Sequence, residues 1–252
     1  PLLEARGREG RIRHIHGDAH LGNVAMIDGA PLFFDAIEFD DRVATGDILY
    51  DLAFLVMDIW RHGHQAEASR VFNRYLTVHG DRSDLAALAA FPFFLMMRAA
   101  IRAKVTAARL SFLEGEARAE AAKDAGDAFR TACAFLDPAP ARVVAVGGFS
   151  GTGKTTLSRR LAPTIGRAPG AVHLRTDIIR KRHAGVALTE RLPRETYTRA
   201  SSAAVYDDLM EQAGIILGAG QAVLLDAVFA APQEREAAEA VAAEASEQGA
   251  AA

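Results

Sequence analysis

The chain has 252 residues, half of them hydrophobic and 24% charged, which is typical of a globular protein with one large domain or two small ones and excludes disorder for most of it. Its 29 basic and 32 acidic side chains nearly balance, so the charge gives no reason to expect a nucleic acid or an anionic membrane as a partner. The most apolar run, residues 85–97, contains Pro92 and is too short to cross a bilayer.

The first half of the chain changes from short extended segments to long helices. Apolar runs separated by turns predict short strands over residues 11–16, 23–27 and 32–34, and Asp28-Gly29 is typical of a tight hairpin turn. From Gly46 to Leu136, apolar residues recur at helical spacing and strand signals are nearly absent. Most of this half is therefore predicted to be a helical bundle.

A proline-containing linker, Asp137-Pro138-Ala139-Pro140, separates the two halves. We therefore expect one domain over residues 1–137 and a second over residues 141–252. In the second domain a strand, a Gly-rich turn and a helix alternate in an order that predicts a parallel sheet. The expected elements are strands at 142–146, 172–174 and 222–225, and helices at 154–161, 201–217 and 232–252.

A phosphate-binding motif follows the first strand of the second domain. Residues 148–155, GFSGTGKT, fit the pattern G-x-x-x-x-G-K-[ST] between a strand and a helix. The glycines let backbone N–H groups surround an anion, while Lys154 supplies a positive charge and Thr155 a hydroxyl group for Mg²⁺. We predict that ATP and Mg²⁺ bind here, with contacts from Gly148, Ser150, Gly151, Thr152, Gly153, Lys154, Thr155 and Thr156.

Three further side chains are candidates for the same site. Asp226 ends the strand 222–225, where a carboxylate would orient Mg²⁺, although a helix cap would also explain it. Asp177 and Arg180 are three residues apart and share a helix face, so the carboxylate could orient an acceptor hydroxyl and the guanidinium a phosphate. The alternative for this pair is an N-cap aspartate with a surface arginine.

This half resembles the P-loop small-molecule kinases of the gluconate-kinase, adenylate-kinase and zeta-toxin-like group, in which D-x-x-R after the second strand faces the acceptor. The resemblance covers residues 142–230. It implies an α/β P-loop fold and a small hydroxylated substrate. Members of the group close an arginine-bearing lid over the phosphates, and no such segment is identified here, so we expect a chain cut at its C-terminus.

The string HGDAHLGN at residues 16–23 is the second motif, and it is followed by Asp35 and by GDILYDLA at residues 46–53. It resembles the catalytic loop of aminoglycoside and choline phosphotransferases, relatives of the protein kinases. The resemblance implies that Asp18 aligns the acceptor hydroxyl and accepts its proton, while Asn23 and Asp35 bind Mg²⁺. It also implies structural roles for the two aspartates of the later segment, of which the first braces the catalytic loop; these are Asp47 and Asp51.

Two features of this half leave alternatives open. His14, His16, Asp18 and His20 are spaced by two and would share one face of a strand, as in a metal site. The stretch from Arg98 to Leu110 looks like the basic helix of the phosphotransferase-like family, or it is a solvated helix face. Fewer than twenty residues precede His16, which leaves no room for a nucleotide-covering lobe. We therefore expect a chain cut at its N-terminus; the alternative is a degenerate lobe that is retained for its substrate surface or for packing.

Together the motifs resemble a bacterial bifunctional family in which an aminoglycoside phosphotransferase-like domain precedes an ATP-binding domain. The expected fold is a partial, mostly helical α+β kinase-like lobe followed by an α/β P-loop domain. We expect a phosphotransferase that moves the γ-phosphate of ATP to a hydroxyl of a small molecule. Alternatives are catalysis by the first half with the P-loop domain as a nucleotide sensor, or a non-catalytic ATP-binding module. A single Cys133 and the absence of an apolar leader suggest a cytoplasmic protein, and the oligomeric state is not indicated.

Overall fold

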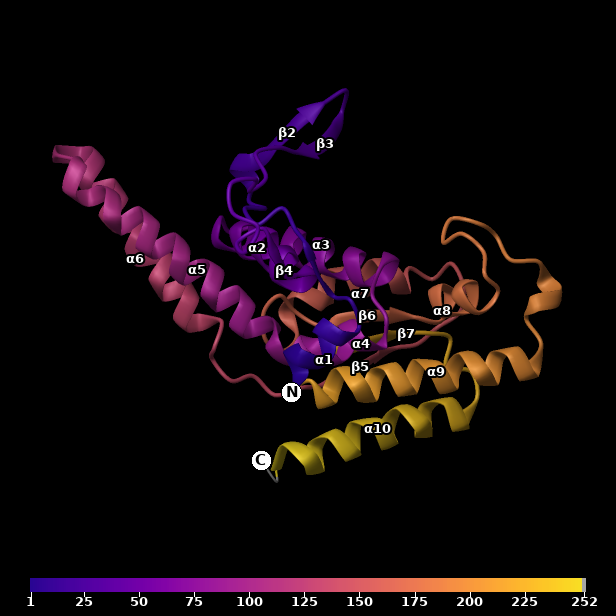
Figure 1. Cartoon of the computed structure of the whole chain (residues 1–252). Helices are drawn as coiled ribbons and strands as arrows, with labels where there is room; N and C mark the ends of the chain where they lie inside the picture. Colours follow the sequence, from indigo (N-terminus) through magenta and orange to yellow (C-terminus); the bar gives the residue numbers. More distant parts are fainter. Residues whose placement is uncertain (251–252) are drawn as a thin grey trace. The chain divides into compact units, whose positions relative to one another are not determined.

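The computed structural model describes residues 1–250, which form two compact units (Figure 1). Unit 1 contains residues 1–72 and 90–138, and unit 2 contains residues 73–89 and the chain from Ala139 onward. Unit 1 is mostly helical, and unit 2 contains a parallel sheet with helices. The predicted fold classes of the two halves are thereby confirmed.

Unit 1 begins with α1 (Leu2–Arg8) and two small antiparallel sheets. Strand β2 (Val24–Ile27) pairs with β3 (Ala30–Phe33) around the predicted turn, where Asp28 and Gly29 both have a positive φ. Strand β1 (Ile12–His14) pairs with β4 (Thr45–Asp47). The sequence does not predict β4, because two of its three residues, Gly46 and Asp47, are of types that are disfavoured in strands, and its strand character comes from the pairing with β1.

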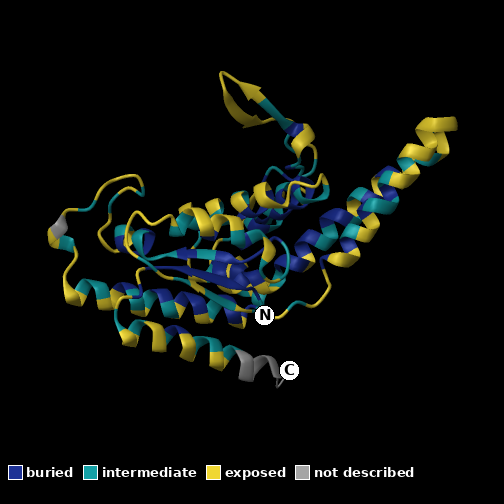
Figure 2. Ribbon diagram, turned by 180° about the vertical axis from the view of Figure 1, so that it is seen from behind, coloured by how far each residue is buried: buried dark blue, intermediate teal, exposed yellow. Residues whose placement is uncertain are grey.

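The rest of unit 1 is built from α2 (Ile48–Arg61), the start of α3 (Gln65–Val78), α5 (Phe91–Ala108) and α6 (Gly115–Ala134), with 3₁₀ turns at Leu21–Asn23 and Arg109–Phe112. Helices α5 and α6 lie side by side, and α2 packs on α5 (Figure 1). Apolar side chains of these helices form the core, among them Leu49, Met57, Phe91 and Leu95. The β2–β3 hairpin, in contrast, is largely exposed (Figure 2).

Among the residues that the structure describes, one helical stretch is long and apolar enough to cross a membrane by length and composition alone. It runs from Arg82 to Phe112, has a mean hydropathy of 1.6 in its most apolar window, and includes the apolar run at residues 85–97. Of that window, 56% is buried inside the protein, as in the core helix of a folded domain. The absence of a membrane partner remains a prediction.

Residues 73–89 lie in the first half of the chain, yet they group with unit 2. They comprise the end of α3, α4 (Arg82–Ala86) and most of a 3₁₀ turn at Ala87–Ala90. The side chain of Asn73 donates to the carbonyl of Ala171 at 3.1 Å and accepts from the N–H of His173 at 2.7 Å. Arg82 pairs with Asp208 and Glu211 at 2.9 and 2.7 Å. The partners in these polar contacts are about 100 or more residues away in the sequence. No local sequence signal therefore assigns residues 73–89 to unit 2.

Unit 2 is organised around the parallel sheet β5–β7–β6, formed by Val143–Val146, Val223–Asp226 and Val172–Arg175. All four residues of the central strand β7 are buried. Its helices are α7 (Lys154–Leu161), α8 (Thr176–His183), α9 (Arg199–Gly218) and α10 (Pro232–Ala250), with 3₁₀ turns at Ala162–Thr164 and Arg194–Thr196. The last helix was predicted to reach residue 252, whose position lies outside the described residues.

The strand register fixes where the functional residues of unit 2 lie. Val146 of β5 and Arg175 of β6 both align with Asp226 of β7. Because the strands are parallel, their carboxyl ends meet at one edge of the sheet. The Gly-rich loop after β5 and the last residues of the other two strands are therefore brought together at that edge.

Candidate functional site

The Gly-rich loop lies between β5 and α7, as its motif predicts. Gly148 and Gly153 have φ angles of +143° and +88°, conformations that L-residues with a side chain rarely adopt. A Cβ atom on Gly148 would also lie 3.2 Å from Oγ1 of Thr152. Lys154 is the first residue of α7, and its Nζ donates to the carbonyl of Phe149 at 2.7 Å. The loop thus places its backbone and one ammonium group at a helix N-terminus, where an anion is favoured.

Asp226 lies beside this loop and is held by three groups. Its Oδ2 accepts a hydrogen bond from Oγ1 of Thr155 at 2.6 Å and contacts Nε2 of His173 at 3.2 Å. Nε of Arg175 is 3.7 Å from the same oxygen. The carboxylate is only 5% exposed. The next helix begins at Pro232, so the alternative role of Asp226 as a helix cap is wrong.

These contacts determine the charge of Asp226. Burial alone would raise the pKa of this carboxyl, but the hydrogen bonds from His173 and Thr155, together with the charge of Arg175, lower it below its ordinary value. The side chain is therefore a carboxylate at neutral pH. An ionised carboxylate next to a threonine hydroxyl and an anion-binding loop is a donor set that fits Mg²⁺ bound to phosphates.

Asp177 and Arg180 lie on α8, and their environment differs from the alternative of an N-cap aspartate with a surface arginine. The N-cap of α8 is Arg175, so Asp177 does not cap the helix. Oδ2 of Asp177 lies 3.2 Å from Nζ of Lys181. Arg180 is buried and donates to Oγ of Ser201 at 3.0 Å, so it is not a surface arginine. The alternative of an N-cap with a surface arginine is therefore wrong.

These groups share one open cleft of unit 2, with a volume of about 710 Å³. Loop residues Ser150, Lys154 and Thr155 line it together with the three predicted side chains Asp177, Arg180 and Asp226. The sequence predicts these residues to act together, and the fold places them around one space. Gly148 and Thr152 complete the loop, and Gly151, Gly153 and Thr156 also line the cleft.

Sequence reasoning missed Arg175 and Tyr206, which line this cleft, and His173, which contacts Asp226. Arg175 and His173 are two residues apart on β6, and this spacing puts both on one side of the strand, so strand alternation could have identified them. Tyr206 also lines the cleft; its hydroxyl accepts a hydrogen bond from the N–H of Phe229 at 2.9 Å. Phe229 has a φ of +52°, and no sequence signal indicates that a tyrosine on α9 would hold this turn.

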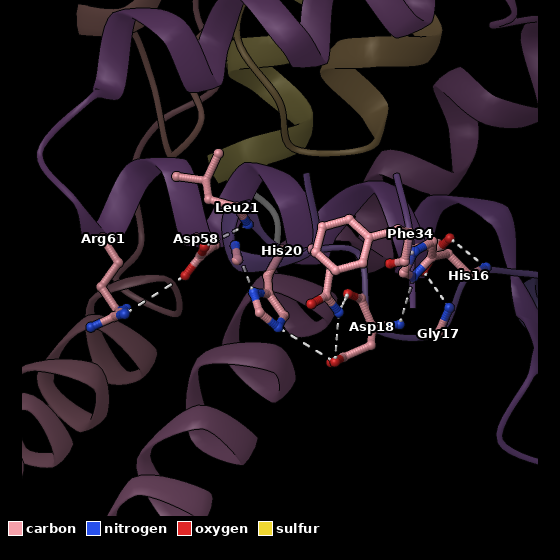
Figure 3. Close-up of polar contacts among 11 residues, drawn as sticks. His16, Gly17, Asp18, His20, Leu21, Phe34, Asp58 and Arg61 are labelled. Atoms are coloured by element: carbon pink, nitrogen blue, oxygen red, sulfur yellow. Dashed lines mark hydrogen bonds and ion pairs between the residues drawn. The ribbon is translucent and has the colours of Figure 1, made fainter. Parts of the chain in front are cut away.

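In unit 1, the predicted catalytic loop is fixed by carboxylates of α2 (Figure 3). The backbone N–H groups of His16 and Gly17 donate to the two carboxylate oxygens of Asp51, each at 3.0 Å. Farther along, the N–H of Leu21 donates to Oδ2 of Asp58, also at 3.0 Å. Both aspartates come from one helix, so α2 fixes the loop at two points. Asp58 was not identified from the sequence.

Asp18 lies inside this loop with a side chain that is 43% exposed. Its Oδ2 accepts a hydrogen bond from Nδ2 of Asn23 at 3.1 Å and lies 3.4 Å from Nε2 of His20. Because Asn23 uses its amide nitrogen in this contact, its carbonyl oxygen is left for a metal ion. Asp35 is exposed, has a φ of +60°, and follows Phe34, whose N–H donates to the carbonyl of Asn23. This main-chain bond joins the end of the hairpin, next to Asp35, to the loop that carries Asp18 and Asn23.

One expectation for this half, the role of Asp47, is corrected by the structure. Asp47, the first aspartate of GDILYDLA, does not brace the loop: it caps α2 by accepting from the N–H of Leu49 and forms a buried ion pair with Arg6. The brace is the second aspartate, Asp51, because the chain turns into α2 at Asp47 and one helical turn is needed to reach the loop.

The alternative metal site of alternating histidines fails because β1 ends at His14. The residues that follow are in a loop, so a spacing of two no longer places them on one face. Among residues 1–250, no group of three or more His, Cys, Asp or Glu side chains could hold a metal ion. Mg²⁺ in either unit would therefore need further oxygen ligands, such as water or phosphate, besides the side chains named above.

The basic stretch from Arg98 to Leu110 forms the end of α5 and the 3₁₀ turn after it. Lys104 and Arg109 are exposed, as a solvated helix face requires. Arg98 is buried, with its guanidinium stacked on Tyr50 and Phe54. The alternative of a solvated face is therefore wrong for Arg98.

Two domain families match the chain. Residues 2–91 match the phosphotransferase enzyme family, and residues 143–249 match a family described as an AAA domain. The order of the two matches confirms the predicted arrangement, in which a phosphotransferase-like half precedes a P-loop half.

Relatives from Mycobacterium bovis and from two strains of Mycobacterium tuberculosis are 34% identical to the chain over 247 residues. Each match covers 96% of this chain and 47% of the relative, so the chain spans about half the length of the curated relatives it matches. Each relative is described only as an uncharacterized protein. No solved structure matches the chain.

Proposed function

We propose that this chain, in which a phosphotransferase-family domain is followed by an AAA-family domain, belongs to an ATP-dependent phosphotransferase that acts on a hydroxyl group of a small molecule. The cleft of unit 2 is the observation that carries the proposal. It combines the anion-binding loop at 148–155 with a hydroxyl and an ionised carboxylate suited to Mg²⁺, and with a second carboxylate on α8. Few functions other than nucleotide phosphate binding require this combination.

Each residue of the cleft then has a physical role. Lys154, which in the free loop is held by the carbonyl of Phe149, can exchange this neutral acceptor for charged phosphate oxygens. Thr155 and Asp226 would hold Mg²⁺, which neutralises phosphate charge when bound. Asp177 would orient the acceptor hydroxyl, and Arg180, fixed by Ser201, would face a phosphate oxygen.

Calorimetric titration with Mg·ATP tests the proposal. Lys154→Ala should weaken binding roughly 10- to 100-fold, because a charge-assisted contact to phosphate is lost. Lys123→Ala is the matched control, since Lys123 is an exposed lysine of α6 in unit 1. Circular dichroism checks that both variants are folded. If a folded Lys154→Ala variant binds Mg·ATP as tightly as the unmodified chain, the assignment of the nucleotide site fails.

A second candidate is catalysis by unit 1, with the P-loop domain as a nucleotide-sensing regulator. The specific observation in its favour is the bracing of the catalytic loop by Asp51 and Asp58, which holds Asp18 in a fixed position. Phosphoryl transfer to a panel of hydroxylated compounds separates the two. If Asp18→Asn abolishes transfer and Lys154→Ala spares it, unit 1 is the catalytic half. If the reverse holds, unit 2 is.

A non-catalytic ATP-binding module is the remaining alternative. It would bind Mg·ATP in the calorimeter, and Lys154→Ala would weaken that binding in the same way. Across the acceptor panel it would give no phosphorylated product. Product formation with any hydroxylated compound, lost in either the Asp18 or the Lys154 variant, would exclude it.

A further inference from the structure

Helix α5 carries two arginines that form no ion pair among the described residues. Arg98 is only 8% exposed, and Arg102 is partly buried one helical turn later, on the same face. The Nε atoms of both are buried without a hydrogen-bond partner. Within residues 1–250, neither guanidinium forms an ion pair or a hydrogen bond.

Other buried or partly buried arginines of the chain are treated differently. At least one guanidinium nitrogen of Arg6, Arg61, Arg167 and Arg180 donates to a carboxylate, a hydroxyl or a backbone carbonyl, although Nε of Arg61 is also without a partner. A buried N–H group without an acceptor is costly, and two neighbouring like charges on one helix repel each other. The pair on α5 therefore has donors and positive charge that are unused in the chain itself.

Within the described chain, the surroundings of Arg98 cover its guanidinium without giving its N–H groups an acceptor. Its Cζ lies 3.9 Å from the ring centre of Tyr50 and 4.5 Å from that of Phe54, so aromatic rings cover a face of the guanidinium. Stacking of this kind uses the π face of the group, whereas all of its N–H bonds point outward in its plane. A planar or tetrahedral oxyanion that approaches in that plane can be bound by two parallel hydrogen bonds.

Arg98 also lies near the catalytic loop of unit 1. Tyr50 and Phe54 are on α2, the helix whose Asp51 holds His16 and Gly17. Burial lowers the pKa of Arg98, and this effect is opposed by Tyr50 and by the charges of Asp51 and Asp18. The group nevertheless forms no ion pair with either carboxylate among the described residues. Asp51 is occupied by the loop N–H groups and Asp18 by Asn23.

We propose that Arg98 and Arg102 form a binding site for the anionic group, phosphate or carboxylate, of a small-molecule ligand of unit 1. Two guanidinium groups on one helix face favour an anion and disfavour a cationic aminoglycoside. The anion site does not depend on the catalytic role proposed for Asp18. Only the further step, that the bound ligand is also the hydroxyl acceptor, rests on that proposed role.

Side-chain NMR of the arginine Nε–H groups tests the site directly. The full chain carrying Lys154→Ala is titrated with inorganic phosphate and, separately, with acetate, so that the phosphate site of the P-loop contributes little. The Nε–H signals of Arg98 and Arg102, assigned by substitution, should shift and saturate. A stronger response to phosphate would indicate a phosphorylated ligand, and one to acetate a carboxylate. Sodium chloride at the same ionic strength should not reproduce the shifts.

Arg102→Gln is the decisive variant, because Arg102 has no aromatic stacking partner and its loss should leave the fold intact. It should weaken anion binding about tenfold or more, as measured at the Arg98 signal. Arg109→Gln, which removes an exposed arginine just after α5, is the matched control. The proposal is overturned if both Nε–H signals stay unshifted by phosphate and acetate in a folded protein, or if chloride shifts them equally. Failure of Mg·ATP binding, in contrast, would contradict only the function proposed for the P-loop.

Discussion

The side chain of Asp51 provides the most direct test of how the predicted catalytic loop of unit 1, residues 16–23, is held. Its two carboxylate oxygens accept one backbone N–H each, from His16 and Gly17, at 3.0 Å. The variant Asp51→Asn keeps the size of the side chain but replaces one acceptor oxygen by an NH₂ donor. One of the two loop N–H groups then faces another donor, and the remaining bond loses its charge assistance.

The expected cost follows from these two bonds. Losing one charge-assisted hydrogen bond and weakening the other should destabilise the closed loop by about 2 kcal/mol. Hydrogen exchange at the amides of His16 and Gly17 should then accelerate by roughly 30-fold, since about 1.4 kcal/mol corresponds to a factor of ten. Urea unfolding followed by Trp60, the single tryptophan of the chain and a residue of α2, should show a lower midpoint.

Two comparison variants make the result interpretable. Asp41→Asn changes an exposed aspartate of unit 1 and should alter neither exchange nor unfolding. Asp47→Asn breaks the buried pair with Arg6 and should lower stability by about 3–5 kcal/mol, with its largest local effect at the amide of Leu49. If Asp47→Asn selectively accelerates exchange at His16 and Gly17 and Asp51→Asn does not, the assignment of the brace to Asp51 is refuted.

Two further predictions concern unit 2. Burial raises the pKa of Tyr206 to about 12. The stabilising contribution of the neutral phenol is therefore complete below the unfolded pKa of about 10 and is lost as the pH rises toward 12. Tyr206→Phe should reduce this loss of thermal stability at alkaline pH, and an unchanged loss would contradict the reasoning. Gly148→Ala, at a φ of +143° and 3.2 Å from Thr152 Oγ1, should destabilise the protein by roughly 1–2 kcal/mol. Gly214→Ala, in open space on α9, should instead stabilise it by roughly 0.5–1 kcal/mol, and equal melting temperatures for the two variants would refute this account.

The architecture of unit 2 could be predicted because its signals are local. An apolar β-branched strand, a Gly-rich turn and a helix start occur within twenty residues of one another, and each follows from backbone preference and spacing. The carboxyl ends of parallel strands necessarily meet at one edge, which is why Asp226 could be placed near the loop before its contacts were known. What holds Asp226 there, including His173, required the actual register of β6 against β7.

The remaining features depend on partners that are distant in the sequence. Residues 73–89 read as part of a helical bundle, and only the bonds of Asn73 and Arg82 to later residues assign them to unit 2. Similarly, Asp47 and Asp51 are four residues apart on one helical segment, and the choice between them as the brace depends on where α2 begins. Because α2 begins at Ile48, Asp47 caps the helix, and Asp51, one turn later, accepts the N–H groups of the loop.

The two candidate catalytic groups lie in different units, so variants of the two groups can be compared independently. Asp18, with its contacts to Asn23 and His20, is built entirely from residues of unit 1. Lys154 and the cleft around it are built entirely from residues of unit 2. A substitution at either position therefore removes one site without altering a side chain of the other, so the loss of transfer by only one of the variants would identify the half that performs the chemistry.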